Sequence, residues 1–123
     1  MIPVAIIGAS TDRTKFGNKA VRAFLRQGYM VYPVNPREPL IEGLRAFATI
    51  ADVPVRPSLV SVYVRPAVLM GMLEDIAAKG CDELWLNPGT ESADVLARAW
   101  QLKLNVVQGC SVLAIGVSPA DFQ

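Results

Sequence analysis

Short apolar runs alternate with longer stretches of helical spacing along this chain, and that alternation constrains the fold most. The runs are Ile2–Ile7, Tyr29–Val34, Leu59–Val64, Glu83–Asn87 and Asn105–Gln108. Runs that are apolar at consecutive positions are typical of strands in a parallel sheet covered on both faces, and parallel neighbours need helical crossovers. The sequence therefore predicts an α/β fold: a doubly wound parallel sheet of five to six strands, with helices on both faces, in one domain spanning residues 1–123.

Three stretches between the runs have the apolar spacing of amphipathic helices. The first stops at Gly28, the second runs from Pro66 to Gly80, and the third is capped by Ser92. We expect their buried stripes to be Phe16, Ala20, Val21, Phe24 and Leu25; Leu69, Met72, Leu73, Ile76 and Ala77; and Val95, Leu96, Ala99 and Trp100. The less regular stretch Leu40–Phe47 fits one further short strand.

The composition excludes several classes of function. Hydrophobic residues make up 52% of the 123 residues, which is enough to form a core without disulfides or metals. Histidine is absent, so Ser-His-Asp and Cys-His nucleophiles are excluded, and two cysteines are too few for a Cys₄ zinc site. The net charge of +1 provides no basic field for nucleic acid, and no apolar run is long enough to cross a membrane. We expect a cytoplasmic protein with no metal site, no nucleic-acid partner and no membrane contact.

The residues that follow each strand matter most for function, because ligands of open α/β sheets bind at the carboxyl ends of the strands. The first predicted strand is followed by Gly8, Ala9, Ser10 and Thr11. A glycine there lets a ligand approach the main chain, and the N–H groups at the next helix start, near Lys15, can bind phosphate. The same residues also fit a tight strand-to-helix turn without a ligand. Residues 1–61 hold eight basic and four acidic residues, which favours an anionic ligand in this half.

The next turn narrows the choice of ligand. The dinucleotide fingerprint G-x-G-x-x-G is incomplete, because the glycine after Gly8 is Gly17. The second predicted strand ends at Asn35, followed by Pro36 and Arg37, where an NAD site usually has an acidic residue for the ribose. An amide and a guanidinium suit a phosphorylated ribose, since a charge-assisted Arg–phosphate contact contributes on the order of 1.5–3 kcal/mol. NADP and coenzyme A both fit, and Arg37 fits a solvated loop residue as well.

A longer set of motifs carries a family resemblance. It comprises Val4–Ser10, Gly28-Tyr29 before Val31–Pro36, Gly43, Thr49–Pro54, Val64–Pro66, Leu84–Leu86 and Cys110. These motifs resemble those of the small stand-alone CoA-binding proteins, whose domain is similar to that of succinyl-CoA synthetase α-subunits and ADP-forming acyl-CoA synthetases. The resemblance covers nearly the whole chain, and it implies a cytoplasmic, Rossmann-like domain that binds coenzyme A.

Carried over residue by residue, the resemblance implies three groups of contacts. They are Gly8, Ser10 and Thr11 for the pyrophosphate; Asn35, Pro36 and Arg37 for the adenosine end; and Val64, Arg65 and Pro66 for the adenine or the start of the pantetheine arm. Two departures concern the pantetheine end. Ser58 stands where the family commonly has an acid, and Asn87–Thr90 follows the family pattern only in part.

The resemblance does not bring a catalytic site with it. Related synthetases use a phosphohistidine in a further domain, and this chain has no histidine. Cys110 fits a small residue packed after the last strand, or alternatively a thiolate that meets the CoA thiol in a mixed disulfide. We therefore expect a module that binds CoA or an acyl-CoA without catalytic residues of its own. Two alternatives stay open: an NADP-linked oxidoreductase, and a scaffold whose protein partner depends on the ligand. A homodimer is compatible with so apolar a domain.

Overall fold

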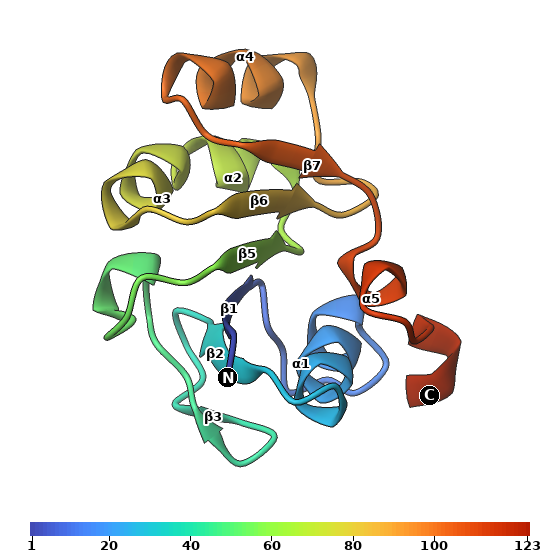
Figure 1. The fold of residues 1–123 in the computed structure, drawn as a ribbon. Helices are drawn as coiled ribbons and strands as arrows, with labels where there is room; N and C mark the ends of the chain where they lie inside the picture. The colour runs from blue at the N-terminus through green and yellow to red at the C-terminus, as the bar shows by residue number, and fades with distance from the viewer.

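The computed structural model describes residues 1–123, and its centre is a sheet of five parallel strands (Figure 1). The strands are β1 (Pro3–Ile7), β2 (Met30–Val34), β5 (Leu59–Val62), β6 (Glu83–Leu86) and β7 (Val106–Gln108). Their order is β2-β1-β5-β6-β7, so the chain places β2 on one side of β1 and β5 on the other. The predicted Rossmann-like α/β fold is confirmed, and all five apolar runs contain a strand.

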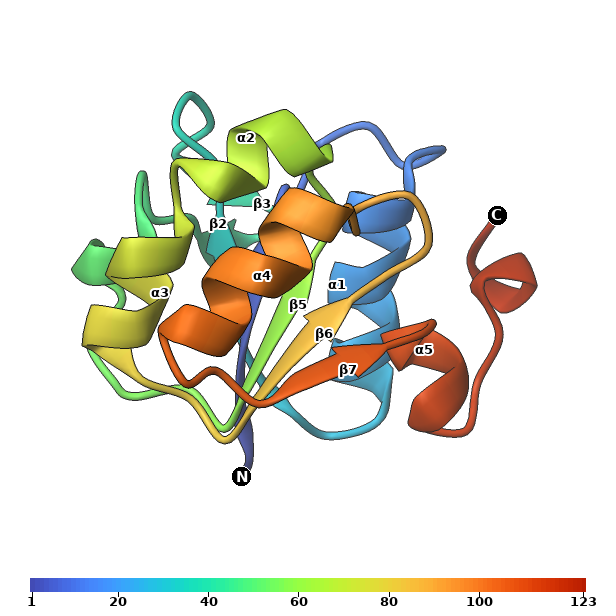
Figure 2. The same ribbon diagram turned by 90° about the horizontal axis from the view of Figure 1, so that it is seen from above.

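Helices cover both faces of the sheet (Figure 2). The two sets are α1 (Phe16–Arg26) with α5 (Ser111–Ala114) on one face, and α2 (Pro66–Met70), α3 (Leu73–Lys79) and α4 (Ala93–Gln101) on the other. Successive residues of β1 point to opposite faces: Val4 and Ile6 belong to the core beneath α1, and Ala5 and Ile7 belong to the opposite core. These four side chains are essentially inaccessible to solvent, which explains why the run is apolar at consecutive positions.

The end of α1 shows how local sequence sets the connection to β2. The N–H of Gly28 bonds to the carbonyl of Leu25 at 3.1 Å, and the N–H of Tyr29 bonds to that of Phe24 at 3.0 Å. This pair of bonds is the Schellman motif, and its hydrophobic contact is present as well. The rings of Phe24 and Tyr29 meet edge to face, with centroids 4.9 Å apart. The glycine stop predicted at position 28 therefore turns the chain directly into the next strand.

Two predicted elements are subdivided in the structure. The single helix expected from Pro66 to Gly80 breaks into α2 and α3, where Gly71 and Met72 make tighter bonds to residues three positions earlier. Glycine costs a helix interior about 1 kcal/mol, which makes the break inexpensive. The stretch Leu40–Phe47 forms the hairpin β3 (Leu40–Ile41) and β4 (Leu44–Arg45), and Phe47 adds an isolated bridge to Val34.

The sequence analysis assigned no element to the carboxyl-terminal segment. After β7 it forms α5 and a 3₁₀ turn, Pro119–Phe122, that packs on α1. Ser118 and Asp121 cap this turn reciprocally, and Arg22 donates a 2.6 Å hydrogen bond to the carbonyl of Phe122. The guanidinium of Arg26 lies over the Phe122 ring at 4.4 Å. The side of α1 that carries Arg22 and Arg26 is thus partly covered.

Three residues assigned to buried stripes are exposed: Phe16, Leu25 and Trp100. Trp100 has 84% of its surface accessible, although Val95 and Ala99 on the same helix are fully buried. Phe16 is 61% exposed at the first position of α1, where no neighbouring element covers it. Helical spacing alone cannot separate a residue at the margin of the apolar face from one at its centre.

Candidate functional site

A cavity of about 480 Å³ opens at the carboxyl edge of the sheet, between β1 and β5. This is the topological switch point, because the chain leaves β1 toward one side and later adds β5 on the other, and ligands bind there in open α/β sheets. The cavity is lined by Gly8, Thr14, Lys15, Phe16, Gly17, Tyr63, Val64, Arg65, Pro88, Gly89 and Thr90. Segments from three strand ends thus meet at one hollow.

Two glycines let these segments approach one another. Gly8 has a φ of +85°, and a Cβ built on it would lie 2.9 Å from the carbonyl carbon and oxygen of Tyr63. A Cβ on Gly17 would lie 2.1 Å from the carbonyl oxygen of Gly8. Gly17 therefore permits the close contact of helix and strand that the third glycine of a dinucleotide fingerprint provides. The incomplete motif in the sequence had given no role to this residue.

The amino-terminal end of α1 opens into the cavity. Lys15 is its N-cap residue in an extended conformation, and no side chain caps the helix. The N–H groups of Phe16 and Gly17 consequently have no acceptor within the chain. Lys15 and Arg65 belong to the same lining, and neither side chain makes an ion pair. Free N–H groups, the positive end of a helix dipole and two cations form a site suited to an anion such as a phosphate.

The turn after β1 is held from beneath by two asparagines. Asn18 is fully buried, and its amide nitrogen donates to the carbonyl of Ser10 at 2.9 Å and to Glu42 at 3.1 Å. The amide nitrogen of Asn35 donates to the carbonyl of Ala9 at 2.8 Å. Sequence reasoning missed Asn18. A signal was available, because asparagine is a poor helix former and rarely stands inside an amphipathic helix without a partner.

Ser10 and Thr11 stand beside the cavity and do not line it. The hydroxyl of Ser10 accepts a 3.0 Å hydrogen bond from the N–H of Asp12, and Thr11 is exposed. Asp12 in turn accepts from the hydroxyl and the N–H of Thr14, at 2.7 and 3.0 Å. These hydrogen bonds, the hydroxyl first, lower the pKa of Asp12. The turn is therefore fixed by its own side chains before any ligand arrives.

The segment after β2 is joined to the turn and lies outside the cavity lining. The side-chain oxygen of Asn35 accepts from the N–H of Arg37 at 2.8 Å and from that of Glu38 at 3.1 Å. Both ends of this amide are thus occupied by main-chain groups. Pro36 and Arg37 are exposed, and the Arg37 guanidinium makes no ion pair. The segment Asn35–Arg37 is one of the three predicted groups of ligand contacts. Its connection to the turn beside the cavity is the hydrogen bond from the Asn35 amide to the carbonyl of Ala9.

The segment after β5 forms the opposite wall. Val64 and Arg65 line the cavity, and Pro66 begins α2 next to them. Tyr63, which sequence reasoning did not select, lines the cavity as well, and its hydroxyl lies 3.1 Å from the hydroxyl of Ser111. Burial raises the pKa of Tyr63, so the phenol is neutral at ordinary pH. The ring acts as a fixed wall between this cavity and a smaller one.

The smaller cavity, of about 110 Å³, shares Phe16, Tyr63 and Pro88 with the first and extends to Cys110. Beneath it lies a buried polar network. The amide nitrogen of Asn87 donates to the Ser61 hydroxyl and to the carbonyl of Val62, both at 2.9 Å, and its oxygen accepts from the N–H of Ser111 at 2.9 Å. Every polar atom of that amide is satisfied, so the network holds the ends of β5 and β6 against the start of α5.

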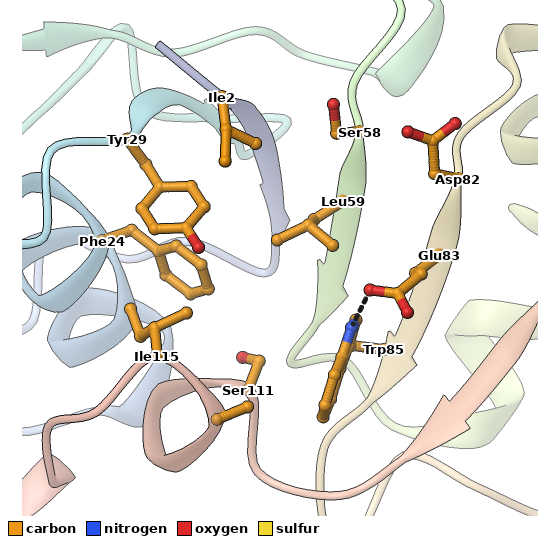
Figure 3. Close-up of a pocket in the computed structure, with 11 residues that line it drawn as sticks. Ile2, Phe24, Tyr29, Ser58, Leu59, Asp82, Glu83, Trp85, Ser111 and Ile115 are labelled. Atoms are coloured by element: carbon orange, nitrogen blue, oxygen red, sulfur yellow. Dashed lines mark hydrogen bonds between the residues drawn. The ribbon is translucent and has the colours of Figure 1, made fainter.

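A third cavity, of about 440 Å³, lies on the α1 side of the sheet and reaches the amino ends of β5 and β6 (Figure 3). Phe24, Tyr29 and Leu59 form its apolar wall, and Trp85 donates a 3.2 Å hydrogen bond to Glu83. Glu83 and Asp82 border the hollow with two carboxylates. The two carboxylates would repel a phosphorylated ligand, and the cavity lies at the amino ends of the strands, whereas ligands of open α/β sheets bind at the carboxyl ends. This cavity is therefore unsuited to such a ligand.

Three further features bear on the class of site. No three side chains among Asp, Glu and Cys come together in a way that would hold a metal ion. The two cysteines are free, and burial raises the pKa of Cys81 to about 11, so its thiol is protonated at neutral pH. No helix in this fold is long and apolar enough to span a bilayer.

The fold and the cavity together define a Rossmann-like α/β domain with an uncapped helix start at its switch point, an arrangement suited to an anion. Comparison with known proteins identifies the family: residues 3–116 match the CoA binding domain model, and the chain belongs to this family. The predicted resemblance to small stand-alone CoA-binding proteins is thereby confirmed.

Individual relatives agree with this assignment. The chain is 32% identical over 78 residues to the α-subunit of an ADP-forming acetate–CoA ligase II of Pyrococcus furiosus, a match that covers 63% of this chain and 17% of that protein. The aligned part of the chain therefore corresponds to about a sixth of that relative. A conserved hypothetical protein from Pyrococcus furiosus superposes with a TM-score of 0.86 at 26% identity, covering 93% of this chain and 99% of the other.

A larger protein contains the same fold. A dinucleotide-forming acetyl-coenzyme A synthetase 1 of Ca. Korarchaeum cryptofilum, solved with phosphate and ADP, superposes with a TM-score of 0.75 at 25% identity. The match covers 85% of this chain and 25% of that one. The domain thus occurs both alone in short chains and as one part of longer enzymes.

Proposed function

We propose that the protein binds coenzyme A, or an acyl-CoA, in the cavity between β1 and β5. The observation that carries the proposal is the pair of N–H groups of Phe16 and Gly17 that have no acceptor, beside the free cation of Lys15. Membership of the CoA binding domain family supports coenzyme A as the source of that anion. The diphosphate of the coenzyme would accept hydrogen bonds from these N–H groups, and Arg65 would neutralise part of its charge from the opposite wall.

The adenosine end would extend toward the segment after β2. The amide of Asn35 is used to hold the turn, so the proposal assigns it a positioning role beneath the ligand. Arg37 is the free cation of that segment, and it is suited to the 3′-phosphate that distinguishes coenzyme A from dephospho-CoA. Val64 and Pro66 would border the adenine or the start of the pantetheine arm.

The pantetheine arm would run past Tyr63 and Pro88 toward the smaller cavity at Cys110, because the two cavities share their lining there. Cys110 also packs against the core beneath α1, which supports its interpretation as a packed side chain. The proposal therefore contains no covalent step at this thiol and assigns no catalytic residue.

Isothermal titration calorimetry with coenzyme A, dephospho-CoA, NADP and NAD tests the proposal. Coenzyme A should bind with the highest affinity and NAD with the lowest, because only coenzyme A and NADP carry a phosphorylated ribose. A ligand at 100 times its dissociation constant should also stabilise the fold by about 2.7 kcal/mol. Binding of NADP without binding of coenzyme A would support the oxidoreductase alternative instead.

A matched pair of variants locates the site. Lys15→Ala should weaken coenzyme A binding about tenfold, since it removes one phosphate contact of about 1.4 kcal/mol. Arg56→Ala removes a cation at the opposite, amino-terminal edge, where Arg56 pairs with Asp82 at 2.7 Å, and should leave the affinity unchanged. Equal effects of the two substitutions would contradict the proposed location.

A further inference from the structure

The carboxyl-terminal segment supplies part of the wall of the smaller cavity. Pro119, the first residue of the 3₁₀ turn, lines this cavity with residues from four other segments: Phe16 of α1, Tyr63 after β5, Asn87 and Pro88 after β6, and Cys110 after β7. The residues that match the CoA binding domain family end at position 116. The wall formed by Pro119 is therefore a feature of this chain that family membership does not imply.

This part of the wall is held firmly on α1 (Figure 1). Ser118 and Asp121 cap the turn reciprocally, on either side of Pro119. At the end of the turn Phe122 is only 4% exposed, and Arg22 of α1 donates a 2.6 Å hydrogen bond to its carbonyl. Pro119 is thus fixed between a capped start and a buried end.

The volume of the smaller cavity limits what it can hold. The cavity measures about 110 Å³, and a water-sized group occupies roughly 30 Å³. About four heavy atoms therefore fill it, which is the number in a propionyl group and one fewer than in a butyryl group. The thiol of free coenzyme A would leave most of this space empty, and a hexanoyl chain would exceed it.

The lining offers no partner for a charged acyl group. None of the six lining residues is a cation, and both polar atoms of the Asn87 amide are bonded within the chain. The Tyr63 hydroxyl lies 3.1 Å from that of Ser111. Lys19 lies over the Phe16 ring, 5.3 Å from its centroid, and does not line the cavity. A carboxylate inside the cavity would lose its hydration without gaining an opposite charge.

We propose that the smaller cavity receives the acyl group of an acyl-CoA and selects uncharged acyl groups of two to four carbons. The inference rests on the proposed coenzyme A site, because the two cavities share Phe16, Tyr63 and Pro88, past which the pantetheine arm would run. Pro119 is then a specificity-determining residue, since it forms part of the wall that a longer chain would meet.

Calorimetry of the full chain with coenzyme A and its acetyl, butyryl, hexanoyl and malonyl thioesters tests the inference. Butyryl-CoA should bind about tenfold more tightly than acetyl-CoA, because it buries two more methylene groups. Hexanoyl-CoA should bind at least about tenfold more weakly than butyryl-CoA, because its chain does not fit. Malonyl-CoA is close to butyryl-CoA in size and should also bind at least about tenfold more weakly, because its carboxylate would be buried without a partner.

A matched pair of variants assigns the size limit to Pro119. Pro119→Gly removes the ring from the wall, so the gap between hexanoyl-CoA and butyryl-CoA should narrow from about tenfold to about twofold. Ala120→Gly places a glycine in the same turn at an exposed residue that does not line the cavity, and it should keep the wild-type preference. Circular dichroism checks that both variants are folded, and the series of thioesters on the wild-type protein tests the inference without them.

The possible outcomes separate this inference from the proposed function. Coenzyme A that binds together with an equal affinity for butyryl-CoA and hexanoyl-CoA would overturn the inference and leave the coenzyme site standing. Malonyl-CoA that binds as tightly as butyryl-CoA, or a folded Pro119→Gly variant with the wild-type preference, would do the same. Absence of binding by coenzyme A and all four thioesters would overturn the coenzyme site itself, and the inference with it.

Discussion

The turn after β1 and the loops after β5 and β6 meet at the same edge of the sheet, yet they satisfy their polar groups in different ways. At the start of α1, the N–H groups of Phe16 and Gly17 face a cavity and have no acceptor. After β6, both polar atoms of the Asn87 side chain are hydrogen-bonded within the chain, to Ser61, Val62 and Ser111. The first region keeps hydrogen-bonding capacity free for a ligand, and the second uses its capacity to hold the edge together.

The difference between the two regions indicates where a ligand can gain binding energy. A buried polar group that is already paired contributes to stability and offers little to a ligand, while an unpaired N–H at a helix start has a favourable bond still to make. Substitutions in the two regions should therefore separate into those that affect binding and those that affect only stability.

The largest effect should come from Gly17→Ala. A Cβ would lie 2.1 Å from the carbonyl oxygen of Gly8, so α1 would have to move away from β1. We expect a loss of about 3 kcal/mol or more in the free energy of unfolding, measured with urea, together with loss of coenzyme A binding. Gly71→Ala is the control, since its Cβ would meet only Val68 at an ordinary 3.6 Å. A Gly17→Ala variant as stable as wild type would contradict the close packing described here.

Asn87→Ala should come next. It leaves the N–H of Ser111 and the carbonyl of Val62 without their buried partner, which should cost about 2 kcal/mol of stability. Because this region supplies no free donors, the affinity of the folded variant for coenzyme A should change by less than about threefold. A large loss of affinity in the folded protein would mean that the network contacts the ligand directly.

Arg37→Ala sharpens the assignment of the adenosine end. The guanidinium is exposed and unpaired, so its removal should leave the unfolding free energy unchanged. Coenzyme A binding should weaken about tenfold and dephospho-CoA binding should not, because only the former carries the 3′-phosphate. Equal losses for the two ligands would remove this role from Arg37.

The smallest effect should come from Ser92→Ala. The Ser92 hydroxyl accepts a 3.1 Å hydrogen bond from the N–H of Val95 and caps α4, and Ser92 itself does not line the cavity. Its loss should cost about 1 kcal/mol of stability, and calorimetry should find the coenzyme affinity unchanged. Altered affinity would show that α4 and the cavity are coupled.

The strand framework could be predicted because its signal is local. Consecutive apolar residues such as Val4 to Ile7 are required when both faces of a strand are buried, and Gly28 and Ser92 act within one turn of their own position. Part of the site was predictable for the same reason. Gly8 and Lys15 flank a strand end and a helix start, and Val64 and Arg65 follow the next strand inward.

The features that were not predicted depend on contacts between segments that lie apart in the sequence. Gly17 is needed because of Gly8, and Asn18 because of Ser10 and Glu42, so neither role can be assigned before the turn is built. Trp100 was assigned to a buried stripe because helical spacing cannot show that nothing packs beyond α4.

The most direct test of the central claim is a titration of ¹⁵N-labelled protein with coenzyme A, followed by amide NMR. The N–H groups of Phe16 and Gly17 should show the largest shifts, because they gain acceptors that they lack in the free protein. Trp85, beside the acidic cavity on the α1 side of the sheet, should show almost none. The largest shifts at Trp85 and its neighbours, with Phe16 and Gly17 unmoved at saturation, would contradict the account.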